Sequence, residues 1–220
     1  MPAFVLLPAS PSDLEAVARV QFAACATDPG FCAIFPKGGT LSSITHFVQS
    51  YEEDMDNDPS YHIMIVKEAM SGEVASFAIW HFFPPRSGDE IDRELLLDDF
   101  PLPNDANREI GCRLMRNSIR KRHELATAFI GLERPYVFLA ALGTSPKYQR
   151  QGAGAKLLEW GLERADDRGL AVYVEGTPAA AHLYKANGFR EIETLKLELK
   201  LAPESTEEHS NVCMIRDPQT

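Results

Sequence analysis

The sequence predicts an α/β (α+β) fold in which helices flank a mixed central sheet. Short apolar runs typical of strands alternate along the chain with amphipathic stretches typical of helices. Residues 61–67 and 74–82 are two apolar runs separated by a turn that contains Gly72, and this pattern indicates a β-hairpin. Because the hairpin is followed by alternating strands and helices, we expect a mixed sheet in one domain that spans residues 1–220.

The N-terminal part predicts a strand followed by helices. Ser12 and Glu15 have capping-box spacing at the start of a stretch with apolar residues at helical intervals. The tripeptide at 28–30, Asp-Pro-Gly, is expected to end that helix. The expected elements are a strand at 4–7, a helix at 14–26, a short helical turn at 31–35 and a second helix at 40–56.

The segment 84–125 is expected to be an insertion or lid between two strands. Its first part, 84–103, is acidic and contains prolines, and it predicts one short helix. A longer helix is expected to begin at residue 104 or 105 and to run to His123. Arg113, Arg116 and Arg120 share one face of it, either as an exposed basic stripe or as partners of the acidic part.

The C-terminal half shows the clearest alternation of strands and helices. Residues 136–144 form an apolar run that indicates the central strand of the sheet. The expected elements after it are a helix to residue 168, a strand at 171–175, a helix at 179–187, a strand at 189–201, a polar acidic loop at 204–210 and a last strand at 212–216.

Composition limits the class of protein. Of the 220 residues, 45% are hydrophobic and 25% are charged, which is ordinary for a globular protein. The four cysteines form no Cys-x-x-Cys pair, so we expect free thiols and no metal site. No stretch approaches the roughly 18 apolar residues of a membrane span, so we expect a cytoplasmic location. A formal net charge of −10 disfavours nucleic acid as a partner. It favours cationic partners such as amines, although the acids also suit a solvated surface.

A glycine-rich turn follows the central strand. Residues 149–154 read Gln-Arg-Gln-Gly-Ala-Gly and precede an amphipathic helix. Glycines allow a close approach to the backbone, and the N–H groups at a helix N-terminus bind anions such as phosphates. The chain has no Gly-Lys-Ser/Thr, which excludes a P-loop, and Lys156-Leu157 stands where a Rossmann turn needs its third glycine. An ordinary tight helix start is the alternative interpretation.

A second motif lies about 30 residues further on. Residues 183–189 read Leu-Tyr-Lys-Ala-Asn-Gly-Phe and follow a buried strand and a helix start. Together, Gln-x-x-Gly-x-Gly and this motif resemble the GCN5-related N-acetyltransferases (GNAT), most closely over residues 136–189. The residues at 174–178 and 214–216 also resemble uncharacterised fungal members of that family, a likeness that identifies no substrate.

The resemblance implies a mostly antiparallel sheet that splays at its central strands and binds acetyl-CoA there. The pantetheine arm is then expected on main-chain groups of the central strand, and the pyrophosphate on the glycine-rich turn. At position 177 many family members carry asparagine, whereas this chain carries threonine. The residues implied in cofactor binding are Leu142, Gly143, Thr144, Gln149, Arg150, Gln151, Gly152, Ala153, Gly154, Ala155, Thr177 and Tyr184.

The resemblance also implies that Tyr184 is the general acid that protonates the departing thiolate. The alternative is a half-buried aromatic residue that only packs. The histone-acetylating branch carries a glutamate in its central strand, but residues 136–141 contain no acid here. Glu175 is therefore the first candidate for the base, with a polar strand end as its alternative. His81 is a second candidate, and a water chain is a third possibility.

The resulting prediction is an acetyl-CoA-dependent N-acetyltransferase whose acceptor is a primary amine, with a small molecule favoured over a protein or peptide. A non-catalytic acyl-CoA-binding module is the other alternative. As a hypothesis, the segment 84–103 covers the acceptor pocket, and Asp89, Asp92 and Glu94 attract a cationic amine. The sequence leaves a monomer and a homodimer equally open.

Overall fold

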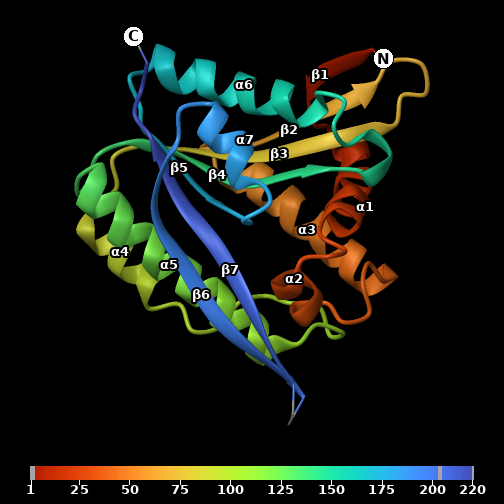
Figure 1. Ribbon diagram of the computed structural model, residues 1–220, viewed down its shortest axis with the longest axis horizontal. Coiled ribbons are helices and arrows are strands. Elements are labelled where there is room, and N and C mark those ends of the chain that lie inside the picture. Colours follow the sequence, from red (N-terminus) through yellow and green to blue (C-terminus); the bar gives the residue numbers. More distant parts are fainter. Residues whose placement is uncertain (1–2, 203–204, 220) are drawn as a thin grey trace.

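A seven-stranded sheet forms the centre of the computed structural model, which describes residues 3–202 and 205–219. Its strands are β1 (Phe4–Pro8), β2 (Tyr61–Glu68), β3 (Val74–Phe83), β4 (Tyr136–Thr144), β5 (Val172–Gly176), β6 (Arg190–Ala202) and β7 (Ser205–Arg216). They lie in the order β1-β2-β3-β4-β5-β7-β6 (Figure 1). The pair β4–β5 is parallel and the other neighbours are antiparallel, which confirms the predicted mixed, mostly antiparallel sheet.

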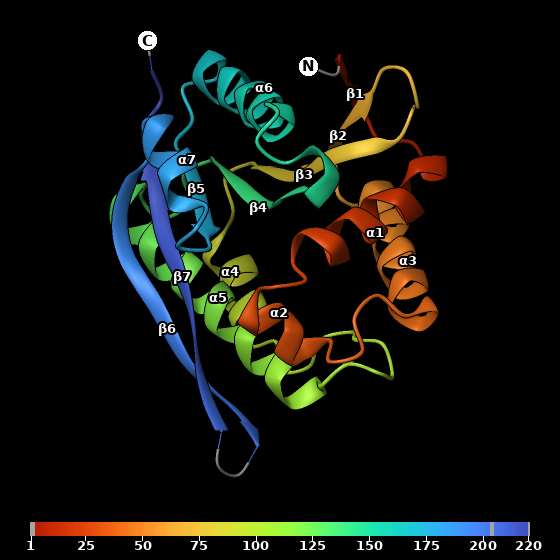
Figure 2. The same cartoon turned by 45° about the vertical axis from the view of Figure 1, so that its right-hand side comes forward.

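Helices cover both faces of the sheet. They are α1 (Leu14–Ala24), α2 (Pro29–Ile34), α3 (Leu41–Asn57), α4 (Gly88–Leu95), α5 (Arg108–Phe129), α6 (Ala153–Asp167) and α7 (Ala181–Ala186). Figure 2 shows α6 on one side of the sheet and α1, α2, α3 and α5 on the other. Within the part of the chain that the structure describes, no helix is long and apolar enough to cross a membrane.

The alternation of side chains along β3 builds the two cores. Phe77 and Ile79 pack with α1 and α3, whereas Ala78 and Trp80 pack with α6 on the opposite face. Helix α6 approaches β3 closely at Gly161, where a Cβ atom would lie 2.2 Å from the indole of Trp80. The chain from β4 into α6 is therefore held against the sheet by a fully buried tryptophan.

The start of the chain differs from the prediction in two details. The carboxylate of Asp13 accepts hydrogen bonds from the backbone N–H and the hydroxyl of Ser10, so the cap precedes the expected Ser12–Glu15 pair. Asp28 does not end a helix but begins α2, because its side chain accepts a hydrogen bond from the N–H of Phe31 (2.7 Å). The short helix therefore starts earlier than the expected turn at 31–35.

The prediction of a polar loop at 204–210 is wrong for residues 205–210, because these residues belong to β7, which begins at Ser205. Glu204 lies outside the residues that the structure describes. The polar residues there pair with β6 in a long hairpin, which runs alongside α5 (Figures 1 and 2). Lys196 lies opposite Ser210 and forms an ion pair of 3.0 Å with the diagonal neighbour Glu208. Cross-strand pairs of this kind stabilise a strand whose outer face is polar.

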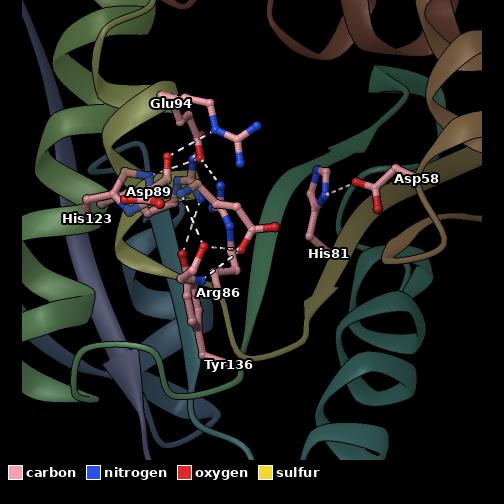
Figure 3. A network of polar contacts seen from close by, with 11 residues as sticks. Asp58, His81, Arg86, Asp89, Glu94, His123 and Tyr136 are labelled. Carbon is pink, nitrogen blue, oxygen red and sulfur yellow. Dashed lines mark hydrogen bonds and ion pairs between the residues drawn. The ribbon is translucent and has the colours of Figure 1, made fainter.

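A buried polar network fixes α4 and α5 to the sheet (Figure 3). Glu94 of α4 binds Arg122 of α5, and it lies 2.7 Å from Arg86 and 3.0 Å from the Nε2 atom of His123. Arg122 also donates a hydrogen bond of 3.2 Å to the hydroxyl of Tyr136 in β4. Burial by itself raises the pKa of Glu94, but His123 and the two arginines outweigh it and hold the pKa well below its usual range.

Replacing Glu94 by glutamine tests this anchor. The Glu94→Gln variant should lose about 3–5 kcal/mol of unfolding free energy at pH 7, because Arg122 is left buried without its carboxylate. Since the folded-state pKa of Glu94 is lowered, its contribution is complete above the ordinary glutamate pKa of about 4.3 and is lost as the pH falls further. Denaturant titrations of both proteins at pH 7 and pH 3.5 measure the difference.

The matched control is Glu191→Gln, which removes a carboxylate from an exposed pair with Lys185. Exposed pairs contribute little, so its unfolding curve should nearly match that of the wild-type protein. Equal stability losses in the two variants, or a difference that stays constant down to pH 3.5, would contradict the assignment of Glu94 as the anchor.

Candidate active site

A β-bulge in β4 opens the sheet next to β5. Ile79 of β3 pairs with Ala141 and Trp80 pairs with Leu139, so Ala140 is an extra residue in β4. The parallel pairing of β4 with β5 ends at Leu139, which faces Val174. In the described residues the rest of β4 therefore has no strand partner on its β5 side, because a bulge bends and twists the strand that contains it. This confirms the expected splay.

A cavity of about 450 Å³ lies at this opening. Its walls come from both sides of the split, and also from α1, α2, α5, α7 and the β6–β7 hairpin. Leu142 and Gly143 line it from β4, Glu175 from β5, and Thr177 and Tyr184 from the segment that follows β5. The structure thus brings five of the predicted site residues to one cavity.

The predicted turn at 149–155 lies at the end of β4 and leads into α6. Gly152 is the residue before the helix and has φ 91°, and Arg150 has φ 61°, so both are in the left-handed region. Gly154 lies so close to β4 that a Cβ atom would be 3.1 Å from the hydroxyl of Thr144. The first N–H groups of an α-helix lack acceptors within the helix and can bind an anion.

Tyr184 lies on α7 with its ring against the end of β5. A Cβ atom on Gly176 would be 2.5 Å from the ring, so only glycine at 176 leaves room for it. The side chain is almost fully buried, and burial raises the pKa of the phenol to about 12. The hydroxyl therefore keeps its proton through the physiological range of pH.

Glu175 is held by two hydroxyl groups. Its carboxylate accepts hydrogen bonds from Ser118 of α5 (2.7 Å) and from Tyr173 of β5 (2.9 Å). Burial raises the pKa of Glu175, and the two hydroxyl groups together with Arg122 and Lys121 offset only part of that increase. A carboxylate with a raised pKa beside a cavity is suited to accept a proton near neutral pH.

His81 is placed outside this cavity. Its imidazole is stacked on Phe83 and Phe138, and its Nδ1 atom is 3.5 Å from Asp58 (Figure 3). Burial lowers the pKa of His81 to about 4, so the ring is neutral at physiological pH. The structure does not bring this candidate base to the cavity, because its side chain is enclosed by Phe83, Phe138 and Asp58 and is not among the residues that line the cavity.

The acidic residues of segment 84–103 do not line the cavity. Glu94 is enclosed by the network that anchors α5, and Asp98 forms an ion pair of 3.0 Å with Arg116. No residue of this segment lines the described cavity. Of the three acids in the hypothesis of an acidic cover, Glu94 is bound by Arg122 of α5, and Asp89 and Asp92 do not line the cavity either; α5 itself does.

Several residues at the cavity were not anticipated from the sequence. Ser118, Asp28, His209 and Asn211 line it from α5, from the start of α2 and from β7. Each is far along the chain from the two motifs and belongs to no motif of its own. Their shared location follows from the packing of α2 and α5 against the hairpin.

The residues present fit acetyl-CoA. The open edge of β4 exposes main-chain groups, and the glycine-led start of α6 lies at the end of the same strand. A mixed sheet opened in this way, next to a helix N-terminus, is the architecture of an N-acetyltransferase. The sequence model of the Acetyltransferase (GNAT) family matches residues 40–189, and the chain belongs to this family, whose members use acetyl-CoA.

Solved structures of acetyltransferases share the fold over nearly the whole chain. Arylalkylamine N-acetyltransferase 2 from Aedes aegypti has a TM-score of 0.68 at 12% identity, covering 98% of this chain and 99% of that one. A histone acetyltransferase HPA2-related protein from Corynebacterium glutamicum has a TM-score of 0.60 at 19% identity, covering 100% and 98%. No curated protein matches the chain. At such identities the likeness shows the fold and not the acceptor.

Replacing Gly152 by alanine tests the turn. An L-residue at φ 91° is strained by about 1 kcal/mol, and the displaced N–H groups should bind the pyrophosphate less well. Because a hydrogen bond to a charged group contributes about 1.5–3 kcal/mol, we expect at least about tenfold weaker acetyl-CoA binding by calorimetry.

Gly72 offers a matched control in the β2–β3 turn. It also has a positive φ (71°), and no atom lies within 4 Å of the position that a Cβ atom would take. The Gly72→Ala variant should lose similar stability and keep the affinity of the wild-type protein for acetyl-CoA. Equal affinities in the two variants would show that the turn does not bind the cofactor.

Proposed function

We propose that this acetyltransferase transfers the acetyl group of acetyl-CoA to the primary amine of a small molecule. The observation that carries the proposal is the meeting of Glu175 and Tyr184 at one cavity beside the open edge of β4. Its volume of about 450 Å³ lies in the range of small-molecule pockets. A cytoplasmic location and the likeness to fungal members stay predictions from the sequence.

The cofactor site uses main chain more than side chains. We assign the pantetheine arm to backbone groups of Leu142 and Thr144 and the pyrophosphate to the N–H groups of residues 151–155, with Gln149 and Arg150 beside it. Support comes from the unpaired edge of β4 and the left-handed backbone at Gly152. Thr177 also lies at the cavity as a proposed cofactor contact. Its hydroxyl accepts a hydrogen bond from the N–H of Ala180 and so caps the chain before α7.

The proposed chemistry divides between two side chains. When bound, acetyl-CoA supplies a thioester carbon for the amine to attack and a thiolate that leaves. The Glu175 carboxylate takes the proton of the amine, and its raised pKa makes it a stronger base than an exposed glutamate. Ser118 and Tyr173 orient that carboxylate by donating hydrogen bonds. The Tyr184 hydroxyl holds the proton that the leaving sulfur receives.

The walls of the cavity favour a small acceptor over a peptide. Helices α2 and α5 contact each other, and the hairpin contacts both of them, so these elements surround the cavity on the side opposite α6. A protein N-terminus or lysine tail needs an open groove. The alternative of a non-catalytic acyl-CoA-binding module is disfavoured because the candidates for both the acid and the base, Tyr184 and Glu175, line the cavity.

The proposal is tested by measuring CoA release from acetyl-CoA with a panel of small primary amines and with peptides. Turnover is expected with small amines, and Tyr184→Phe should lower kcat on the order of 10²-fold because the leaving sulfur loses its proton donor. Acetyl-CoA affinity should be unchanged, since the ring remains packed on Gly176. Turnover with peptides alone, or an unchanged kcat in Tyr184→Phe, would contradict the proposal.

The pH dependence identifies the base. A general base must be deprotonated, so kcat/KM should fall at low pH with an apparent pKa above the ordinary glutamate value of about 4.3. In the Glu175→Gln variant this fall of kcat/KM at low pH should disappear, and kcat should be about 10²-fold lower or more. Ser118→Ala is the comparison, since it removes one hydrogen bond to the Glu175 carboxylate. It should shift the pH at which kcat/KM falls without abolishing the fall. A Glu175→Gln profile identical to wild type would exclude Glu175.

A further inference from the structure

Carboxylates line the cavity at two places. Its lining includes two carboxylates, Asp28 and Glu175, and contains no lysine or arginine among the described residues. Glu175 already has a place in the proposed chemistry, whereas Asp28 has none. A pocket lined by one sign of charge within apolar walls concentrates ligands of the opposite sign. An amine reaches the enzyme mostly as an ammonium ion, so Asp28 is a complementary group for it.

Asp28 is rigidly held with part of its carboxylate left for a ligand. Its Oδ1 atom accepts the N–H of Phe31 at 2.7 Å and lies 3.9 Å from the Nδ1 atom of His209. Neither of these contacts uses Oδ2. The exposed fractions of the two side chains are only 18% for Asp28 and 11% for His209, so an ammonium group bound there is largely removed from water.

The position of His209 depends on glycine in α2. A Cβ atom on Gly30 would lie 2.5 Å from the Nδ1 atom of His209, so the imidazole packs directly on the backbone of the short helix. In β7, His209 and Asn211 are on the same face of the strand as Cys213, which pairs with Glu175. Polar side chains therefore continue along this face from the proposed base toward Asp28.

Much of the remaining wall is apolar, although Gln21 and Asn117 also line the cavity. Helices α2 and α5 and strand β6 contribute large hydrocarbon side chains here, namely Phe31, Ile34, Leu114, Met115 and Leu195. Such walls gain free energy by burying hydrocarbon and lose it by burying a second charge without a partner. They therefore suit the body of an acceptor with one amino group and no other charged group.

We propose that the acceptor is a primary monoamine with an apolar body, that Asp28 binds its ammonium group, and that His209 positions Asp28. This inference rests on the proposed function and extends it to a substrate class. Polyamines fit poorly because Glu175 already accepts two hydrogen bonds and serves as the base, so a second ammonium group would meet the apolar walls without a carboxylate of its own. Zwitterionic amino acids fit poorly because their carboxylate meets Asp28 and Glu175. Asp28 captures the ammonium group, and the amine then passes along His209 and Asn211 to Glu175, which takes its proton.

The test compares 2-phenylethylamine, spermidine and phenylalanine as acceptors at saturating acetyl-CoA. The wild-type enzyme should use 2-phenylethylamine with at least tenfold higher kcat/KM than either of the others. In Asp28→Asn the KM for 2-phenylethylamine should rise at least tenfold, while kcat and the KM for acetyl-CoA stay within about threefold. Asparagine keeps an N-cap oxygen for Phe31, so α2 is retained.

Asp56→Asn is the matched control, because it removes the same charge from an exposed site on α3 and should leave every parameter unchanged. His209→Gln should raise the amine KM less than Asp28→Asn does, with kcat retained. Turnover with an unchanged amine KM in Asp28→Asn, or a preference for spermidine, would overturn this inference and leave the proposed function standing. Acetyl-CoA binding without turnover of any amine would overturn both.

Discussion

The site depends on one backbone irregularity, the extra residue Ala140 in β4. The bulge ends the pairing of β4 with β5 after Leu139, and the parallel strands then diverge. A continuous sheet would leave no cavity between them, and the main chain from residue 140 to 144 would be consumed by ladder hydrogen bonds. The same divergence sends the chain after β4 into the turn before α6. The opening and the helix start that we propose for the pyrophosphate therefore lie at the two ends of the same stretch of β4.

Glycines fix the distances between the segments that meet at this opening. Gly143 lets the ring of Phe77 contact β4, Gly176 admits the ring of Tyr184, and Gly30 admits the imidazole of His209. In each case a Cβ atom would lie 2.5 Å from an aromatic ring, which a packed interior does not tolerate. These glycines matter through the side chain that fills the space, whereas Gly152 matters through its backbone angle.

The central part of this site could be predicted from the sequence because it is local. The glycine-rich turn and the tyrosine helix each lie within a few residues of a strand end, so strand–turn–helix patterns locate them. Ser118 and His209 come together with Glu175 only through tertiary packing, and no short pattern encodes that. Asp28 illustrates the ambiguity: Asp-Pro-Gly is typical of a helix end and equally of a helix start, and here the capping bond to Phe31 decides.

Two partly buried glutamates have different roles in this protein. Glu94 is surrounded by Arg86, Arg122 and His123, which lower its pKa and make it a permanent anion that fastens α4 and α5. Glu175 is held by hydroxyl groups, which orient a carboxylate without cancelling the effect of burial, so its pKa is raised. Arg122 acts on both: it binds Glu94 directly and limits the rise at Glu175. Because α5 also provides Ser118, the network that stabilises this helix sets the geometry and the basicity of the base that we propose.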